Sequence, residues 1–123
     1  IKPSELQSLN EAVIGIDFTH KAWETASRLR SVLEQTKHLR HLGANALELC
    51  YVADGTADSF IDLRGKLRVT DIAAAYLILK EAGGTITTLE GKELNAELAP
   101  TQRVSFIAAG NKRLHETIMK QIK

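Results

Sequence analysis

Several features that would restrict the class of protein are scarce or missing in this sequence. Cys50 is the only cysteine, so no disulfide can form within the chain, and a reducing, cytoplasmic compartment is expected. The longest apolar run, 72–79, is far too short to cross a bilayer. No secretory or transit segment is visible at the N-terminus, and there is no internal repeat. We therefore expect a globular protein that is not embedded in a membrane.

An excess of charge of either sign is also missing. The chain carries 16 basic and 15 acidic residues, mixed along its length, for a net charge of +1. This balance argues against a nucleic-acid partner, which requires a basic stripe. With 123 residues, 44% of them hydrophobic and 25% charged, the sequence is typical of one compact domain with its own core.

Strand and helix patterns alternate along the chain. Polar residues 1–10, which include Pro3, are typical of a linker entering a domain that spans 11–123. Short β-branched runs predict strands, and apolar residues at helical spacing predict helices. The predicted strands are 12–19, 39–43, 58–65, 85–91 and 104–110, and the predicted helices are 21–35, 44–53, 71–82 and 112–122. The alternation predicts a layered α/β/α domain around a mixed, mostly parallel sheet of about five strands.

Three side chains on the predicted helices have expected places in the fold. Trp23, with the apolar residues that follow it on helix 21–35, is expected in the core. Cys50 is expected to be a buried, unreactive thiol. Glu48 stands out within an apolar helix, and we expect it to pair with another group or to face solvent.

The stretch VTDIAAAYLILKEAGG, residues 69–84, raises a question about Asp71. Thr70 and Asp71 are both good helix N-cap residues, so a capping role explains the carboxylate. Alternatively, Asp71 lies at a strand–helix junction, where ligands of α/β sheets commonly bind, and is a metal ligand. The nearest acids, at positions 54, 58 and 62, are spread over a turn and a strand. The residues alone leave both interpretations open.

The same stretch resembles the signature of the inositol monophosphatase family, usually WDxAAxxxIxxEAGG. Residues 39–62, LRHLGANALELCYVADGTADSFID, and 106–122, FIAAGNKRLHETIMKQI, resemble the family stretches on either side of it. Residues 12–33 fall where the family has a strand, a loop and a long helix. Thr70 replaces the family's Trp, and the spacing before Asp71 is longer, as in the archaeal branch, which includes fructose-1,6-bisphosphatase activity.

The resemblance implies that this chain corresponds to the C-terminal domain alone. The family's Glu-Glu pair and its DPIDGT or DPLDGT motif belong to an N-terminal domain, and neither occurs here. The implied activity is Mg²⁺-dependent hydrolysis of a small phosphomonoester, inositol monophosphate or fructose 1,6-bisphosphate. By itself this chain is expected to be inactive, with no catalytic residue of its own. The implied partners are the missing N-terminal domain, a phosphorylated substrate and a second copy in a homodimer.

The resemblance also implies roles for individual residues. Asp71 is the one metal ligand that the C-terminal domain contributes. The implied substrate-binding residues are Gly43, Ala44, Asn45, Asp62, Arg40, Arg64 and Arg68. Ala44 stands where the family has a hydroxyl side chain, so only backbone N–H groups remain for a contact there. Arg64 and Arg68 would bind a second phosphate through bidentate hydrogen bonds, or they are simply solvated.

Two other functions remain open. The domain could mediate association without chemistry, through an apolar face that seeks a partner. Alternatively, the parent protein could dephosphorylate a nucleotide such as phosphoadenosine phosphate or NADP, or carry a fused NAD kinase, as relatives of the family do.

Overall fold

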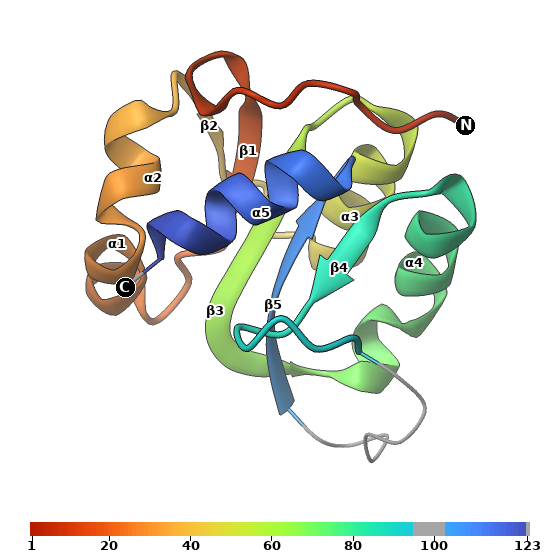
Figure 1. Cartoon of the computed structure of the whole chain (residues 1–123). Helices are drawn as coiled ribbons and strands as arrows, with labels where there is room; N and C mark the ends of the chain where they lie inside the picture. Colours follow the sequence, from red (N-terminus) through yellow and green to blue (C-terminus); the bar gives the residue numbers. More distant parts are fainter. Residues whose placement is uncertain (95–102, 123) are drawn as a thin grey trace.

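The computed structural model describes residues 1–94 and 103–122, and they form a five-stranded sheet covered by helices on both faces (Figure 1). The strand order is β2-β1-β3-β5-β4. β1 pairs in parallel with β2 and β3, whereas β5 is antiparallel to β3 and β4. Four strands therefore run in one direction and β5 runs in the other, which confirms the predicted mixed, mostly parallel sheet. The strands are β1 Val13–Ile16, β2 His38–Arg40, β3 Ser59–Arg68, β4 Thr85–Thr87 and β5 Arg103–Ala109.

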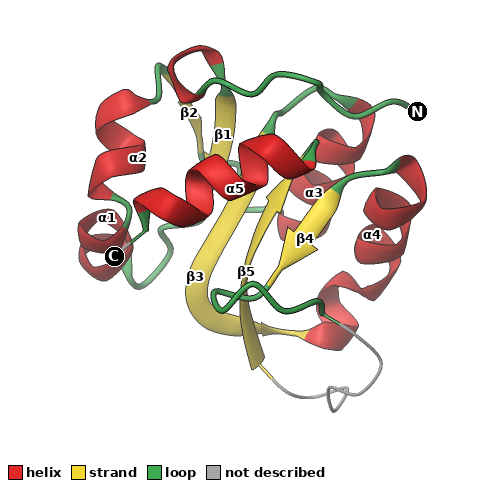
Figure 2. Cartoon of the chain, in the orientation of Figure 1, coloured by secondary structure: helices red, strands yellow, loops and turns green. Residues whose placement is uncertain are grey.

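The helices form two layers (Figure 2). On one face lie the 3₁₀-helix η1 (Leu9–Glu11), α1 (Ala22–Arg28), α2 (Arg30–Gln35) and α5 (Lys112–Gln121). On the other face, α3 (Asn45–Asp54) packs against α4 (Val69–Ala82). The predicted α/β/α layering is confirmed. No helix within the described ranges is long and apolar enough to cross a membrane.

Each face of the sheet has its own hydrophobic core, because successive strand residues point to opposite faces. The core under α1, α2 and α5 contains Ile14, Ile16 and Ile61 from the strands. Phe60 and Phe106 belong to the core under α3 and α4, where their rings meet edge to face at a centroid distance of 5.7 Å.

The predicted helix 21–35 is in fact two helices, since α1 ends and α2 begins around Leu29. The prediction that Trp23 lies in the core is wrong, because its side chain is 85% exposed. Thr25 is the buried residue of α1. Trp23 lies two residues before it, which corresponds to a rotation of about 200° around the helix axis. Trp23 therefore lies on the outer face.

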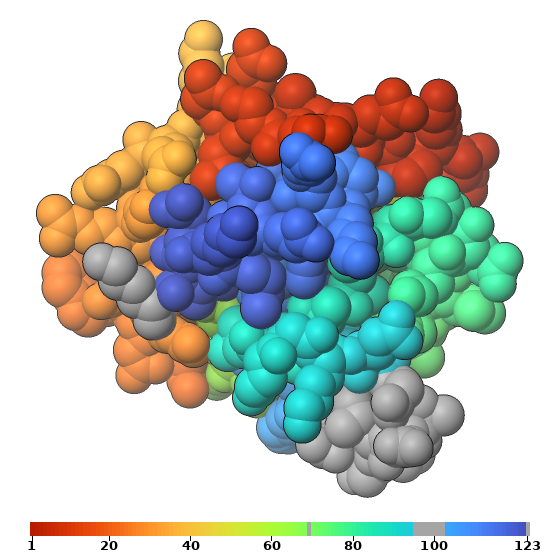
Figure 3. All heavy atoms as spheres, viewed as in Figure 1, coloured from red at the N-terminus to blue at the C-terminus, as the bar shows by residue number. Residues whose placement is uncertain are grey.

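The N-terminal segment runs over the surface next to the start of α5 (Figure 3). The Asn111 side-chain amide donates to the carbonyl oxygens of Ser4, at 3.1 Å, and Leu6, at 2.9 Å. Leu9 is buried in the core. Residues 4–9 thus pack on the domain, and the proposed role of residues 1–10 as a linker stays a prediction.

Gly110 allows the N-terminal segment to approach closely, because it has no side chain. A Cβ at position 110 would lie 2.8 Å from the Ser4 carbonyl oxygen and 2.9 Å from its backbone nitrogen. Backbone atoms cannot move aside cheaply, so Gly110→Ala is expected to destabilise the domain by ~1–3 kcal/mol. It should also speed limited proteolysis within the first ten residues. Thermal melts and protease time courses measure both effects, and an unchanged cleavage rate would show that the segment is not held by this contact.

Candidate functional site

The parallel strands bring charged residues to one edge of the sheet. Asp17 follows the end of β1, and His41 follows the end of β2. β3 is longer than its neighbours and runs on through Arg68 into α4. Ligands of open α/β sheets commonly bind outside the carboxyl ends of the strands. This edge of the sheet is therefore the candidate binding site.

A buried ion-pair network occupies the edge. Arg64 is 8% exposed, and its Nε and Nη2 atoms donate to the two carboxylate oxygens of Asp62 at 3.0 and 2.8 Å. The same Nη2 atom lies 3.0 Å from Asp17 Oδ2. Asp62 is fully buried, and Asp17 is 2% exposed. One guanidinium thus holds two buried carboxylates, which ties β1 to β3.

Asp17 also contacts the segments that follow β1 and β2. Its Oδ1 atom accepts a hydrogen bond from the Thr19 backbone N–H at 2.9 Å and lies 3.4 Å from His41 Nε2. Burial raises the pKa of Asp17, but the hydrogen bonds from Thr19 and the charges of Arg64 and His41 outweigh it and lower that pKa. Asp17 is therefore ionised at neutral pH. Asp17 was not among the residues predicted from the sequence, because it lies within the predicted strand 12–19, whereas β1 ends at Ile16.

The predicted substrate contacts of Asp62 and Arg64 are constrained by this network. Both carboxylate oxygens of Asp62 accept hydrogen bonds from Arg64. Because neither side chain faces solvent, a substrate hydroxyl or phosphate would have to replace an existing ion pair to reach them.

The turn formed by Gly43, Ala44 and Asn45 leads from β2 into α3. Gly43 has a positive φ of 72°, which a residue without Cβ adopts at no steric cost. Ala44 is the N-cap residue and makes no side-chain capping hydrogen bond. The first N–H groups of α3 are therefore available to a negatively charged ligand. Arg40, just before the turn, is exposed and donates only to the neighbouring Leu39 carbonyl oxygen at 2.9 Å within the described structure.

Asp71 lies in the first turn of α4, whose N-cap residue is Arg68. Its Oδ2 atom accepts from the Arg68 backbone N–H at 2.9 Å, and Arg68 Nη2 lies 3.4 Å from Oδ1. The hydrogen bonds from the Arg68 backbone and side chain, with the charges of Arg68 and Arg103, lower the pKa of Asp71. Its side chain is 36% exposed. Asp71 thus caps the helix, while its carboxylate remains ionised and accessible.

Asp71 fits a divalent cation as one oxygen ligand. A stable Mg²⁺ site needs further oxygen ligands. Across residues 1–94 and 103–122, no group of three or more His, Cys, Asp or Glu side chains is placed to hold a metal ion. A site at Asp71 would therefore be completed by water, by substrate oxygens or by carboxylates from outside the described residues.

Glu48 is buried without a normal hydrogen bond. It is 3% exposed, and neither of its carboxylate oxygens has a hydrogen-bond partner in the described structure. Gly15 makes room for it, because a Cβ at position 15 would lie 2.7 Å from Glu48 Oε1. The expectation that Glu48 pairs or faces solvent is wrong. The local sequence could not show that α3 turns this position toward the sheet.

Burial raises the pKa of Glu48, and the Asp17 carboxylate adds to the rise. The backbone N–H groups of Leu42 and Ala44 lie near the carboxylate without forming normal hydrogen bonds, and together with His41 they only partly oppose this rise in the pKa. A carboxyl group whose pKa is raised by folding stabilises the protein at low pH and loses that contribution as the pH rises through its folded-state pKa.

Glu48→Gln is therefore expected to raise the melting temperature at pH values above the raised pKa of Glu48, where the wild type buries a charge. The difference should vanish at acidic pH, where Glu48 is protonated in both states. Melting curves across pH measure this effect, with Glu116→Gln, an exposed acid on α5, as the control. A Glu48→Gln curve parallel to the wild type at all pH values would contradict it.

The edge of the sheet combines an uncapped helix N-terminus, exposed arginines and an ionised carboxylate. These features define an α/β domain suited to a phosphorylated ligand and a cation. The model of the inositol monophosphatase family matches residues 2–123, and the chain belongs to this family. The resemblance found in the sequence is confirmed.

Known proteins similar to this chain include archaeal phosphatases. A fructose-1,6-bisphosphatase/inositol-1-monophosphatase of Methanothermobacter thermautotrophicus is 47% identical, over 78% of this chain and 34% of that protein. A bifunctional NADP phosphatase/NAD kinase of Methanococcus maripaludis is 37% identical, over 97% of this chain and 20% of that protein. The chain thus spans about a third or less of these relatives.

Solved structures agree with this assignment. A Pyrococcus horikoshii protein with similarities to inositol-1 monophosphatase superposes with a TM-score of 0.82 at 37% identity, covering 100% of this chain and 46% of that one. The Thermotoga maritima inositol monophosphatase gives a TM-score of 0.81 at 33% identity, covering 98% and 44%.

Proposed function

We propose that the protein containing this chain is a Mg²⁺-dependent phosphatase of a small phosphomonoester, inositol monophosphate or fructose 1,6-bisphosphate. The observation that carries the proposal is the family match over residues 2–123, together with an accessible, ionised Asp71 at the head of α4. The single cysteine is consistent with a cytoplasmic enzyme.

In this proposal the chain supplies part of the active site. Asp71 provides one oxygen ligand, and its hydrogen bonds to Arg68 fix the carboxylate in position. Mg²⁺, when bound, would stabilise negative charge on the phosphate and activate water. The N–H groups at the start of α3, with Arg40 beside them, bind phosphate or hydroxyl oxygens of the substrate. Arg68 is half exposed and can turn toward a second phosphate.

The buried ion pairs of Arg64 with Asp62 and Asp17 help to fix the positions of these groups. Arg64 and Asp62 hold β3, which leads into α4, while Asp17 connects β3 to the segment after β2 through His41. The geometry of the two helix N-termini thus depends on one set of ion pairs.

We propose that the chain alone is inactive and that further parts of the protein complete the metal site. α4 carries apolar side chains on its outer face, with Leu77 58% and Ile78 40% exposed. Such a face is suited to packing against another domain or a second copy of the protein. A purely associative module remains the alternative if the full-length protein proves inactive.

The test is phosphate release by the full-length protein, with Mg²⁺ or with excess chelator, on inositol 1-phosphate and fructose 1,6-bisphosphate. Activity that requires Mg²⁺ on either substrate supports the proposal. A folded protein that releases no phosphate from any phosphomonoester would overturn it in favour of the associative role.

NADP belongs in the same assay as a second candidate substrate. The bifunctional NADP phosphatase/NAD kinase matches 97% of this chain, a larger share than the fructose-1,6-bisphosphatase/inositol-1-monophosphatase does. A higher kcat/KM for NADP than for either sugar phosphate would make nucleotide dephosphorylation the main activity.

A further inference from the structure

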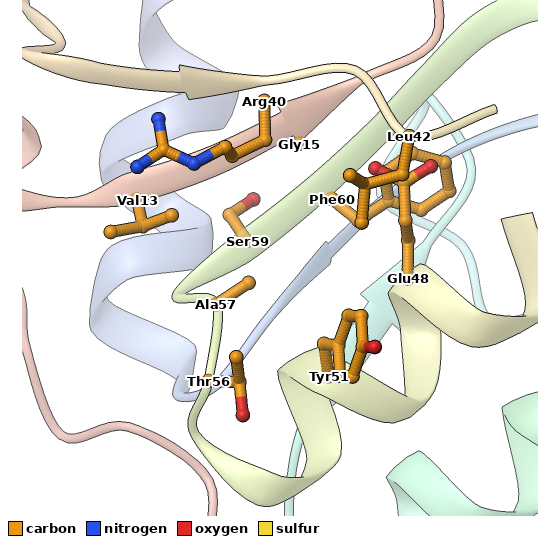
Figure 4. A pocket seen from close by; sticks show the side chains of 10 residues that line it. All are labelled: Val13, Gly15, Arg40, Leu42, Glu48, Tyr51, Thr56, Ala57, Ser59 and Phe60. Carbon is orange, nitrogen blue, oxygen red and sulfur yellow. The ribbon is translucent and has the colours of Figure 1, made fainter. Parts of the chain in front are cut away.

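A cavity of about 310 Å³ lies beside α3, against the face of β1 and β3 (Figure 4). Its volume is at the lower end of the range for small-molecule sites. Arg40 and Thr56, both exposed, line it, so the cavity reaches the surface there. The Arg40 guanidinium points away from the carboxylate of Glu48 in Figure 4.

The cavity wall is mostly apolar and includes two aromatic rings. The large apolar and aromatic residues of the lining are Val13, Leu42, Tyr51 and Phe60. Small-molecule sites typically combine such a lining with a few polar groups that fix orientation. Aromatic faces also attract organic cations.

Besides the exposed Arg40, the lining contains one other charged group, the carboxylate of Glu48, which the proposed phosphatase function does not use. It is buried, and neither oxygen has a hydrogen-bond partner in the described structure. A carboxylate buried without a well-formed hydrogen bond is costly, and a ligand that brings N–H donors and positive charge lowers that cost.

We propose that this cavity is a binding site for a small primary ammonium compound with an apolar body, whose N–H groups pair with the Glu48 carboxylate. The apolar body lies against Phe60 and Tyr51. The proposal stands on the cavity and the unpaired acid, and it does not depend on the phosphatase activity.

The ligand reaches Glu48 by displacing part of the wall. Both carboxylate oxygens are covered, so a direct contact requires one lining side chain to move. Leu42 is 53% exposed and is the least buried apolar side chain of the lining. Its position just before the Gly43 turn gives it room to rotate outward.

The test compares benzylamine, which is cationic at neutral pH, with benzyl alcohol, its neutral analogue of nearly the same shape. Isothermal titration calorimetry on the full-length protein measures both affinities, and NMR shifts locate the site. Charge-assisted hydrogen bonds predict that benzylamine binds about tenfold or more tightly than the alcohol. The largest shifts are expected at Tyr51 and Phe60.

Glu48→Gln should abolish the preference for benzylamine, whereas Glu116→Gln, on α5, should keep it. Ala57→Leu, which adds volume to the lining, should weaken binding of both compounds and tests the cavity independently of the Glu48 carboxylate. Equal affinities of the wild type for amine and alcohol, an unchanged preference in Glu48→Gln, or shifts confined to other surfaces would each overturn the proposal.

Discussion

Asp71→Asn in the full-length protein is expected to lower Mg²⁺-dependent phosphate release about 100-fold or more, while the protein stays folded. Asparagine keeps an oxygen that accepts the Arg68 backbone N–H, so the start of α4 survives. It lacks the negative charge that a hard divalent cation requires. The loss should therefore appear in activity rather than in stability.

Asp54→Asn is the matched control for this prediction. Asp54 is also exposed and also accepts a backbone N–H, from Thr56 at 2.8 Å, but it lies at the far end of α3. Its substitution should leave kcat and the apparent Mg²⁺ affinity unchanged. If Asp71→Asn retains wild-type activity and Mg²⁺ dependence, Asp71 is a helix-capping residue only.

Arg64→Met is expected to destabilise the domain by ~3–5 kcal/mol at neutral pH. Removing the guanidinium leaves Asp17 and Asp62 buried as carboxylates without their cation. This loss of stability relative to the wild type should shrink as the pH falls, because protonation of Asp17 removes one of the unpaired charges. The wild type itself becomes less stable as the pH falls. The stabilisation that comes from the lowered pKa of Asp17 is present at neutral pH and is lost as the pH falls through that pKa.

Arg30→Met provides the comparison for a surface ion pair. Arg30 pairs with Glu34 at 2.9 Å, but its side chain is 81% exposed, so its loss should cost less than about 1 kcal/mol. Urea unfolding of both variants across pH separates the two cases. A cost for Arg64→Met as small as that for Arg30→Met would mean that water reaches the network and that the carboxylates do not depend on Arg64.

The element order was predictable because apolar periodicity and glycine turns are local signals. All five predicted strands, and the predicted helices 44–53, 71–82 and 112–122, correspond to elements of the structure. The break at Leu29 and the outward face of Trp23 were not predictable, since they depend on how α1 meets the sheet. β3 extends past Gly65 because β5 supplies partners for Leu67 and Arg68.

The candidate site was predictable only in part. The importance of Asp71 and of the turn after Gly43 came from the family motif, and the structure adds that Asp71 is accessible. Arg64 and Asp62 lie two positions apart on β3, but Asp17, which follows β1, is 47 positions away from Arg64, so the local sequence gives no indication of that pairing. Glu48 was noticed as an acid in an apolar helix, but its burial without a partner depends on Gly15, 33 positions away.

The strand order has a consequence for synthesis on the ribosome. Among the described strands, β4 pairs with β5 alone, and β5 also pairs with β3. While translation has reached β4 but not β5, this strand has no neighbour in the sheet, and one edge of β3 is unpaired. Residues 103–109, which emerge after the other four described strands, therefore complete the middle of the sheet. The nascent chain must keep these edges from aggregating until residue 109 has left the exit tunnel.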